Sequence, residues 1–548
     1  MPEPTSKRPR AEAPPDRPGG EGGQLLAWLL LLSVMAIVLV ARVRLLDLPL
    51  ERDEGEYAYA GQLILQGVPP YAEADNMKLP GTYFAYAANM ALFGETPRGV
   101  HLGLLAWNVA ATLLLFALGR RLFGTAVAAA GAATFAILSL SPSVLGQAGH
   151  ATQFVVAPLL GGCLLLAGEA TRRAAGRCAL AGLLLGIAFL MKQHAVAAVL
   201  FGAAFVLYDA LAVARLPGRA ALVRLAAFAG GAALPFALLC AYLASRGLFE
   251  NFWFWTVTYA ARYVSSVPLG EGLRILALRL PQVIWFNGLF WLLALAGVVA
   301  LAAGPWPRRA KLFVAGFAVA SFLAVAPGLY FRHHYFVVML PVVGLLAGLG
   351  ADGIARLVAR NTRTAVLVAL IAAAAAVTLY RQREPLFSWD ETTFMRAVYT
   401  TNPFPEAVEV ADYLRRKTEP GERIAVLGSE PEIFFYSGRR AAARYVYAYA
   451  LVERHPFARR LQQQVAQEIE AARPEYIVWA RVDYSWLEQP GADRFIFDWA
   501  EKYLGAHYLL EGVVEVPDEG RGRAVWGDDA ATYRPRTKDH LLVYRRRS

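Results

Sequence analysis

Two adjacent carboxylates, Asp53 and Glu54, stand in a polar stretch that directly follows a long apolar run. A carboxylate at the edge of a hydrophobic bundle is costly to desolvate, so it needs a partner or a task. Asp53 has the chemistry of a general base that takes a proton from a hydroxyl group. Glu54 would hold a metal ion or position its neighbour. The alternative is a solvated acidic loop beside Arg52.

Several cations elsewhere in the chain have the chemistry to stabilise a phosphate leaving group as its negative charge grows. They are Lys78, Lys192 and Arg332, with His194, His333 and His334 as hydrogen-bond donors. For Lys192 and Arg332 the alternative is that each side chain only snorkels from a helix end. We expect no zinc site at His333 and His334, because adjacent histidines are not a chelating spacing.

Other polar and aromatic residues are candidates for the lining of one cavity with these groups. They are Glu56, Tyr57, Tyr59, His150 and Gln153, together with Lys192 and His194. For His150 and Gln153 a structural role is the alternative, because buried polar groups usually just pair with one another.

The composition indicates which elements must position these residues. Of the 548 residues 57% are hydrophobic and 18% are charged, and the mean hydropathy is +0.39. A soluble domain has about 45–50% apolar and about 25% charged residues, so the chain is predicted to be a polytopic membrane protein. The net charge of +11 does not indicate nucleic-acid binding, because the basic residues form short clusters between apolar runs.

Eleven apolar segments approach the length that a helix needs to cross about 30 Å of hydrocarbon. They are 24–44, 101–118, 124–141, 152–168, 178–191, 194–212, 222–245, 282–303, 312–328, 335–351 and 364–380. Basic clusters occupy alternate connections, at Arg120–Arg121, Arg172–Arg177, Arg215–Arg224, Arg308–Lys311 and Arg356–Arg363. The positive-inside bias then predicts a cytoplasmic N-terminus and an extracytoplasmic C-terminal region. Residues 1–23 have the composition of a disordered cytoplasmic tail.

In this topology all the candidate reactive groups face the extracytoplasmic side. The outer loop 45–100 is too long for a simple connector, and short surface helices are predicted at Tyr57–Leu65 and Thr82–Phe93. The aromatic-rich stretch 249–263 is predicted to lie at the membrane interface. Its aromatic residues would form a belt at headgroup depth or, alternatively, one wall of an acceptor groove.

After Tyr380 the composition becomes that of a soluble domain, residues 381–548. The predicted helices are 405–417, 431–436 and 459–472, and the predicted strands are 423–427, 476–479, 508–516 and 541–544. This alternation predicts a small α/β domain on the outer face of the membrane region 24–380. The only glycine-rich cluster is Gly19–Gly23, so no loop offers a cradle for nucleotide phosphates.

These features resemble the GT-C superfamily of polyprenyl-phosphate-dependent glycosyltransferases. The closest likeness is to families 39 and 83, with protein O-mannosyltransferases and lipid A aminoarabinose transferases. The matching motifs are Asp53-Glu54-Gly55-Glu56-Tyr57, Lys78-Leu79-Pro80-Gly81, Arg332-His333-His334-Tyr335-Phe336 and, in the soluble tail, Gly428-Ser429-Glu430-Pro431-Glu432. The last of these is similar to bacterial members.

The resemblance implies roles for individual residues. Asp53 matches the catalytic aspartate of the family, Lys78 matches a lysine near the donor phosphate, and the Arg332–Tyr335 motif is expected at the same phosphate. The sequence departs from the family pattern at two positions. Gln153 stands where many members carry an acidic residue, so the resemblance does not carry over a second catalytic carboxylate. Met77 stands where aminoarabinose transferases have a glutamate before the lysine, which weakens an inherited metal site. A divalent metal is therefore a possible cofactor and none is certain.

The resemblance also implies the reaction. Family members move a sugar from dolichyl or undecaprenyl phosphate to an acceptor hydroxyl at the extracytoplasmic side, usually with inversion. The expected location is a bacterial-type cell membrane, and the acceptor is a lipid, a glycan or a protein. Two alternatives remain: a transporter or flippase for lipid-linked sugars, in which the loop would be a gate, and a non-catalytic membrane scaffold.

Overall fold

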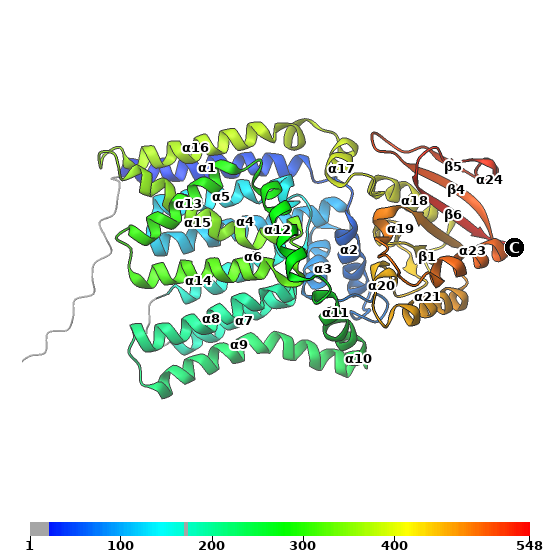
Figure 1. Ribbon diagram of the computed structural model, residues 1–548, viewed down its shortest axis with the longest axis horizontal. Helices are drawn as coiled ribbons and strands as arrows, with labels where there is room; N and C mark the ends of the chain where they lie inside the picture. Colours follow the sequence, from blue (N-terminus) through cyan, green and yellow to red (C-terminus); the bar gives the residue numbers. More distant parts are fainter. Residues whose placement is uncertain (1–20, 169–173, 548) are drawn as a thin grey trace, which may run out of the picture.

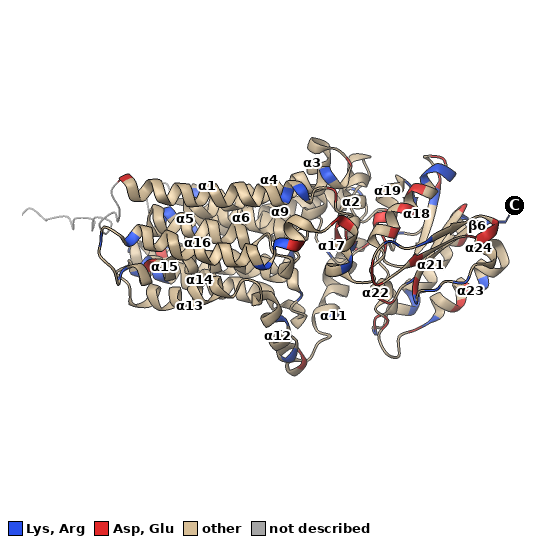
Figure 2. Cartoon of the chain, turned by 90° about the horizontal axis from the view of Figure 1, so that it is seen from above, with Lys and Arg blue, Asp and Glu red and all other residues tan. Residues whose placement is uncertain are grey.

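The computed structural model describes residues 21–168 and 174–547. An elongated bundle of helices lies at one end of the molecule, and a smaller domain built on a sheet lies at the other (Figure 1). Between them lie the short helices α2 (Arg52–Leu65), α3 (Gly81–Phe93) and α10 (Phe249–Trp253). Charged residues are sparse along the middle of the bundle and gather toward its two ends (Figure 2).

A helix occupies each of the eleven predicted spans. They are α1 (Glu21–Arg44), α4 (Pro97–Phe123), α5 (Thr125–Leu138), α6 (Ala151–Leu166), α7 (Ala174–Met191), α8 (Val196–Tyr208), α9 (Gly218–Ser245), α13 (Gly288–Ala303), α14 (Arg308–Val325), α15 (Leu340–Ala355) and α16 (Arg363–Arg381). By length and apolar character, seven helices among the described residues are able to cross a membrane, and up to eight if one bent pair counts as a single span. The prediction of a multi-pass helical membrane protein is confirmed.

The remaining predicted spans are apolar helices that are short or charged at one end. Helices α5 and α6 have 14 and 16 residues. Helix α14 has 18 residues but carries Arg308, Arg309 and Lys311 in its first turn. Helix α1 begins at Glu21, so the predicted disordered tail is too long by three residues, and residues 1–20 lie outside the described part of the chain.

The predicted span 282–303 is wrong at its start. Helix α12 (Leu269–Ile284) and helix α13 meet at an angle of 109°. At the break, the buried side chain of Asn287 donates to Ser141 Oγ at 3.2 Å and accepts from Gln382 Nε2 at 3.2 Å. These contacts bind the turn to the C-terminal ends of helices α5 and α16. The apolar run therefore bends where a polar side chain finds buried partners.

Helix α2 begins with a capping box. The Glu51 side chain accepts from the Glu54 backbone N–H at 3.0 Å, and the Glu54 side chain accepts from the Glu51 N–H at 3.3 Å. This start places Asp53 in the first turn of the helix, where the positive end of the helix dipole favours a carboxylate. The helix is longer than the predicted segment Tyr57–Leu65 and includes both carboxylates of the acidic pair.

Helix α15 is the most deeply buried of the candidate spans. It is directly preceded by the 3-10 helix η6 (His333–Met339), which contains His334. The Thr152 hydroxyl on the first turn of α6 donates to the His334 carbonyl oxygen at 2.8 Å. This contact brings His150, which directly precedes α6, and His334 to the same place at the end of the bundle that faces the C-terminal domain.

The C-terminal domain has a six-stranded mixed sheet in the order β2-β1-β3-β6-β4-β5. Its strands are β1 (Arg423–Leu427), β2 (Arg440–Ala441), β3 (Tyr476–Arg481), β4 (Tyr508–Val516), β5 (Ala524–Trp526) and β6 (Asp539–Arg546). Strand β1 runs parallel to β2 and β3, with Ala425 opposite Ile477, and β6 runs antiparallel to β3 and β4, with Val543 opposite Val478.

Helices of the C-terminal domain alternate with these strands. They are α17 (Glu391–Tyr399), α18 (Phe404–Lys417), α19 (Glu432–Ser437), α20 (Tyr449–Val452), α21 (Ala458–Ala472), α22 (Asp483–Trp486), α23 (Phe495–His507) and α24 (Asp528–Thr532). All the predicted strands and helices occur at or next to their predicted positions. The prediction of a small C-terminal α/β domain is therefore confirmed.

The C-terminal domain is bound to helix α2 by buried polar contacts. Arg52 donates to the Ser429 carbonyl at 2.5 Å, to Glu430 at 3.3 Å and to the Tyr449 hydroxyl at 2.9 Å. The side chains of Arg52 and Glu430 are 7% and 0% exposed, so removing either partner would leave a buried charge without its counterion. The Gly-Ser-Glu-Pro-Glu motif thus serves as the attachment of the domain to the acidic motif.

Gly55 is expected to be required for this attachment. A Cβ atom added at Gly55 would lie 2.7 Å from the Glu432 backbone nitrogen and 2.9 Å from its Cα. Gly55→Ala should lower the unfolding temperature of the detergent-solubilised protein, because such overpacking costs about 1–3 kcal/mol. The matched control is Gly230→Ala in helix α9, where no atom lies within 4 Å of the added Cβ. Equal unfolding temperatures for the two variants would contradict the close approach.

Candidate active site

A cavity of about 330 Å³ lies between the C-terminal domain and the end of the bundle that faces it. The predicted site residues on its wall are Asp53, Tyr57, Lys78, Lys192, His194, Arg332, His334 and Tyr335. They come from helix α2, the loop before α3, the connection between α7 and α8, and the segment that enters η6. The structure thus brings together groups that are up to 282 positions apart in the chain.

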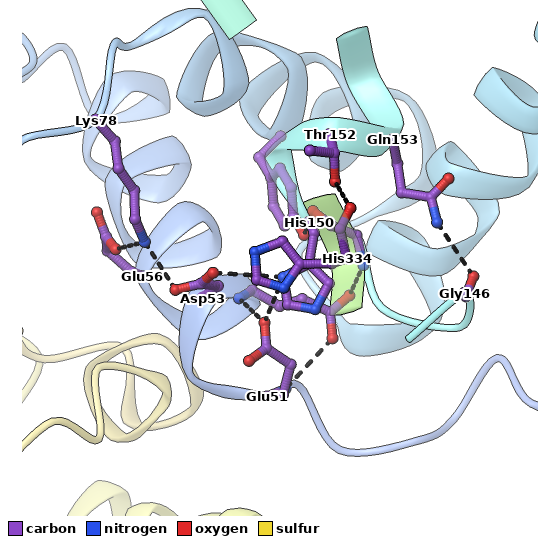
Figure 3. A network of polar contacts seen from close by, with 12 residues as sticks. Glu51, Asp53, Glu56, Lys78, Gly146, His150, Thr152, Gln153 and His334 are labelled. Atoms are coloured by element: carbon purple, nitrogen blue, oxygen red, sulfur yellow. Dashed lines mark hydrogen bonds and ion pairs between the residues drawn. The ribbon is translucent and has the colours of Figure 1, made fainter. Parts of the chain in front are cut away.

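Asp53 binds a different partner with each of its two carboxylate oxygens (Figure 3). Its Oδ1 accepts from Lys78 Nζ at 2.8 Å and from the Tyr447 hydroxyl at 3.1 Å. Its Oδ2 has a single long contact, 3.4 Å to His150 Nδ1. Burial alone would raise the pKa of Asp53, but the Lys78 ammonium, with a contribution from His150, holds that pKa well below its usual value. Asp53 is therefore ionised at neutral pH.

Lys78 is enclosed by anions and aromatic rings. Its Nζ lies 2.5 Å from Glu56 Oε2 as well as 2.8 Å from Asp53, and it sits 4.6 Å and 4.8 Å from the ring centroids of Tyr57 and Tyr447. Burial alone would lower the pKa of Lys78, but the two carboxylates raise it well above its usual value. The charge of Lys78 is thus balanced within the protein.

Lys192 and Arg332 face the same cavity without an anionic partner. Among the described residues, no carboxylate lies within ion-pair distance of either side chain. Lys192 Nζ lies 4.1 Å from the centre of the Tyr335 ring, and Arg332 donates to the Tyr263 hydroxyl at 3.4 Å. Burial lowers the pKa of Lys192 to about 7. A bound anion would supply the charge partner that both groups lack.

His150 and His334 stack with their ring centroids 3.9 Å apart and an angle of 11° between the rings. One nitrogen of each ring and one Asp53 oxygen lie within 4.8 Å of one another, which makes a candidate set of metal ligands. A ligating imidazole holds the ion in the plane of its ring, at about 2.0–2.1 Å for zinc. One ion cannot lie in two parallel stacked planes, so this arrangement does not fit a shared metal ion unless a ring turns.

Four of the predicted residues lie away from the cavity wall. Glu54 points away from Asp53 and accepts from the Gly149 N–H at 2.6 Å, besides a 3.1 Å contact with His101. The Tyr59 hydroxyl accepts from the Ala441 N–H, Gln153 donates to the Gly146 carbonyl at 3.5 Å, and His333 bonds Gln282 at 2.9 Å. Their contacts are those of structural residues.

Glu56 and His150 lie directly behind the cavity wall. Glu56 is buried under Lys78 and also accepts from the Tyr83 hydroxyl at 2.5 Å. His150 lies between Asp53 and Glu51, 3.5 Å from Glu51 Oε1. His194, on the wall itself, bonds the Ala324 carbonyl through Nδ1 at 3.0 Å. Glu56 and His150 therefore support the groups that face the cavity.

Several residues that line the cavity were not among the predicted site residues. The C-terminal domain contributes Tyr447, Tyr449 and Glu453, and the segment 249–264 contributes Trp255, Tyr259 and Tyr263. The density of aromatic residues in 249–263 is a sequence feature that indicated part of this wall. In the structure some of these rings line the cavity, as in the alternative of a groove wall. Nothing in the sequence near Tyr447 distinguishes it from neighbouring tyrosines.

Comparison with known proteins gives a family match over part of the chain and a fold. Residues 77–234 match the family of dolichyl-phosphate-mannose-protein mannosyltransferases. No curated protein matches the chain significantly. The structure is similar to that of ArnT from Cupriavidus metallidurans bound to undecaprenyl phosphate, with a TM-score of 0.58 and 16% identity, over 94% of this chain and 98% of that one.

A second similar structure is that of the Archaeoglobus fulgidus oligosaccharyltransferase in complex with zinc and sulfate. Its TM-score is 0.52 at 14% identity, and the match covers 91% of this chain and 73% of that one. At these identities the structural likeness shows the fold. The fold and the family match over residues 77–234 support the resemblance to the GT-C superfamily of glycosyltransferases.

Proposed function

We propose that the protein moves a sugar from a polyprenyl-phosphate donor to an acceptor hydroxyl on the extracytoplasmic side of the membrane. One observation carries this proposal: an ionised aspartate, Asp53, shares a cavity with two basic side chains, Lys192 and Arg332, that have no carboxylate partner among the described residues. A glycosyl phosphate needs both a base for the attacking hydroxyl and cations for the departing phosphate. The undecaprenyl phosphate bound to ArnT supports this class of donor.

In the proposed reaction, Asp53 Oδ2 takes the proton of the acceptor hydroxyl while the hydroxyl oxygen attacks the anomeric carbon. The bond between that carbon and the phosphate oxygen breaks, and its electron pair stays with the phosphate. Arg332 and Lys192 stabilise the charge that appears there, with Tyr335 as a further hydrogen-bond donor. Attack in line with the leaving group inverts the anomeric centre.

Lys78 takes a different role from the one that the resemblance implies. Its ammonium already forms ion pairs with Asp53 and Glu56, so it does not need a phosphate as a counterion. We propose that Lys78 instead keeps the Asp53 carboxylate ionised and holds it in one orientation. Glu54 supports the fold of the loop through His101 and Gly149.

We also propose the orientation in the membrane. The arginine pairs and triplets at Arg120, Arg215, Arg308 and Arg356 belong to the connections at the bundle end remote from the cavity. Under the positive-inside bias that end is cytoplasmic. The cavity and the C-terminal domain are then extracytoplasmic, the side where an acceptor of the cell envelope would be found.

Mass spectrometry of envelope glycans tests this function. Cells that lack the protein should lose one sugar modification, which the wild-type gene should restore. The lipid-linked form of that sugar should accumulate, because the step that consumes it is blocked. Unchanged glycans and an unchanged pool of lipid-linked sugars would contradict a transferase. Accumulation of the lipid-linked sugar in the cytoplasmic leaflet would instead indicate a flippase.

A further inference from the structure

The segment of the C-terminal domain between β2 and α21 reaches into the catalytic cavity. Tyr447, Tyr449 and Glu453 of this segment line the cavity together with Asp53 and Lys78 of the membrane domain. In Figure 1, helix α20, which begins at Tyr449, lies beside helix α2 at the junction of the two parts. The C-terminal domain therefore forms part of the wall of the cavity.

Within this segment, the Tyr447 hydroxyl is the group that contacts Asp53. It donates to Asp53 Oδ1 at 3.1 Å, and Lys78 donates to the same oxygen at 2.8 Å. A carboxylate oxygen accepts two hydrogen bonds through its two lone pairs, so Oδ1 is fully occupied. Oδ2 retains accepting capacity beside its long 3.4 Å contact with His150. The two donors thus select Oδ2 as the oxygen left for an incoming hydroxyl.

Tyr447 also helps to hold the lysine. Its ring lies 4.8 Å from Lys78 Nζ, and the Tyr57 ring lies 4.6 Å from the same atom. The ammonium is therefore held between two aromatic faces and two carboxylates. Burial raises the pKa of Tyr447 well above its usual value, so the phenol stays protonated and remains a donor.

We propose that Tyr447 is a positioning residue of the transfer reaction: the soluble domain provides the hydroxyl that, with Lys78, orients Asp53 so that Oδ2 faces the acceptor. The inference rests on the proposed function, because it assigns a task to the same aspartate. It also gives the C-terminal domain a part in the chemistry, beyond its attachment to helix α2.

The attachment of the domain does not depend on the Tyr447 hydroxyl. Arg52 binds Ser429, Glu430 and Tyr449, and none of these contacts involves Tyr447. The variant Tyr447→Phe therefore removes one hydrogen bond to Asp53 and leaves the docking contacts in place. The aromatic ring, and with it the contact to Lys78, is retained.

Tyr445→Phe is the matched control. Tyr445 lies in the same segment and is also buried, and its hydroxyl donates to Gln464 Oε1 at 2.7 Å inside the C-terminal domain. The same chemical change thus removes a hydrogen bond that does not reach the cavity. A general effect of hydroxyl loss on the domain would appear in both variants.

The test compares wild type, Tyr447→Phe, Tyr445→Phe and Asp53→Asn as full-length proteins in membranes, with a total lipid extract of the host cells as the source of donor. Tyr447→Phe should lower the maximal rate of product formation about 10- to 100-fold, the range expected for a lost hydrogen bond to a charged group. The amount of extract that gives half the maximal rate should stay within twofold, as should binding of undecaprenyl phosphate. Tyr445→Phe should behave as wild type.

Three results would overturn the inference. A maximal rate of Tyr447→Phe within twofold of wild type, while Asp53→Asn is inactive, would leave the proposed function intact and remove Tyr447 from the reaction. A parallel loss of undecaprenyl phosphate binding would assign Tyr447 to the donor site or to folding. An equal loss in Tyr445→Phe would indicate a structural effect on the domain. Full activity of Asp53→Asn would instead contradict the proposed function itself.

Discussion

Asp53→Asn should lower the rate of sugar transfer about 10²–10⁴-fold, the contribution of a well-placed general base. Asparagine has the size of aspartate but no longer accepts the proton of the acceptor hydroxyl. Lys78 keeps Glu56 as a counterion, at 2.5 Å, so its charge is not left unpaired. The amount of protein in the membrane and its binding of undecaprenyl phosphate should therefore change little. The measurement is the amount of modified envelope glycan in cells that carry only the variant.

The matched control for this change is Asp47→Asn. Asp47 lies in the same outer loop, but its carboxylate is 49% exposed and pairs with Arg98 at the surface. An exposed ion pair of this kind contributes at most about 1 kcal/mol, so transfer should stay at the wild-type level. Full transfer by Asp53→Asn would exclude Asp53 as the base and would remove the main support for the proposed mechanism.

The second large effect is expected at the two cations without carboxylate partners. Arg332→Gln and Lys192→Gln should each weaken the binding of undecaprenyl phosphate about 10- to 100-fold, because each removes a charge-assisted contact with the phosphate. The double variant should bind least, although the two effects will not simply add, since both cations face one anion. Binding can be measured with the detergent-solubilised proteins and undecaprenyl phosphate at low and at high salt.

Arg274→Gln is the control for a change of net charge. Arg274 lies on helix α12, is 70% exposed and pairs with Glu271 away from the cavity. It should bind undecaprenyl phosphate as wild type does. If Lys78→Gln alone abolished binding while Arg332→Gln and Lys192→Gln had no effect, the phosphate would lie at Lys78, as the family resemblance implies, and our assignment would be wrong.

The case of Glu54 shows why the acidic pair could not be resolved from the sequence. The prediction began the helix at Tyr57, which left Asp53 and Glu54 in a loop where both could face one site. In the structure the capping box starts helix α2 at Arg52. Neighbouring residues on a helix point about 100° apart, whereas residues three positions apart share a face. Asp53 and Glu56 therefore both reach Lys78, and Glu54 turns toward His101.

The sequence by itself determined the apolar helices and the order of strands and helices in the C-terminal domain. It also determined which acidic and basic residues of the loop 45–100 could take part in the chemistry. These follow from local properties: the length and hydropathy of a segment, its periodicity, and the turn and capping residues at its ends. The break between α12 and α13 was missed because it depends on partners for Asn287 that lie 95 and 146 residues away.

Only the tertiary structure decided which charges meet. Tyr447 contacts Asp53 across 394 residues of sequence, and its neighbour Tyr445 has the same local surroundings but a different partner. Likewise, Lys78 has carboxylate partners while Lys192 and Arg332 do not. This difference arises when helix α2 and the C-terminal domain pack against one end of the bundle. The reason is physical: the electrostatic state of a buried group depends on every charge and donor around it, and folding brings these together from distant parts of the chain.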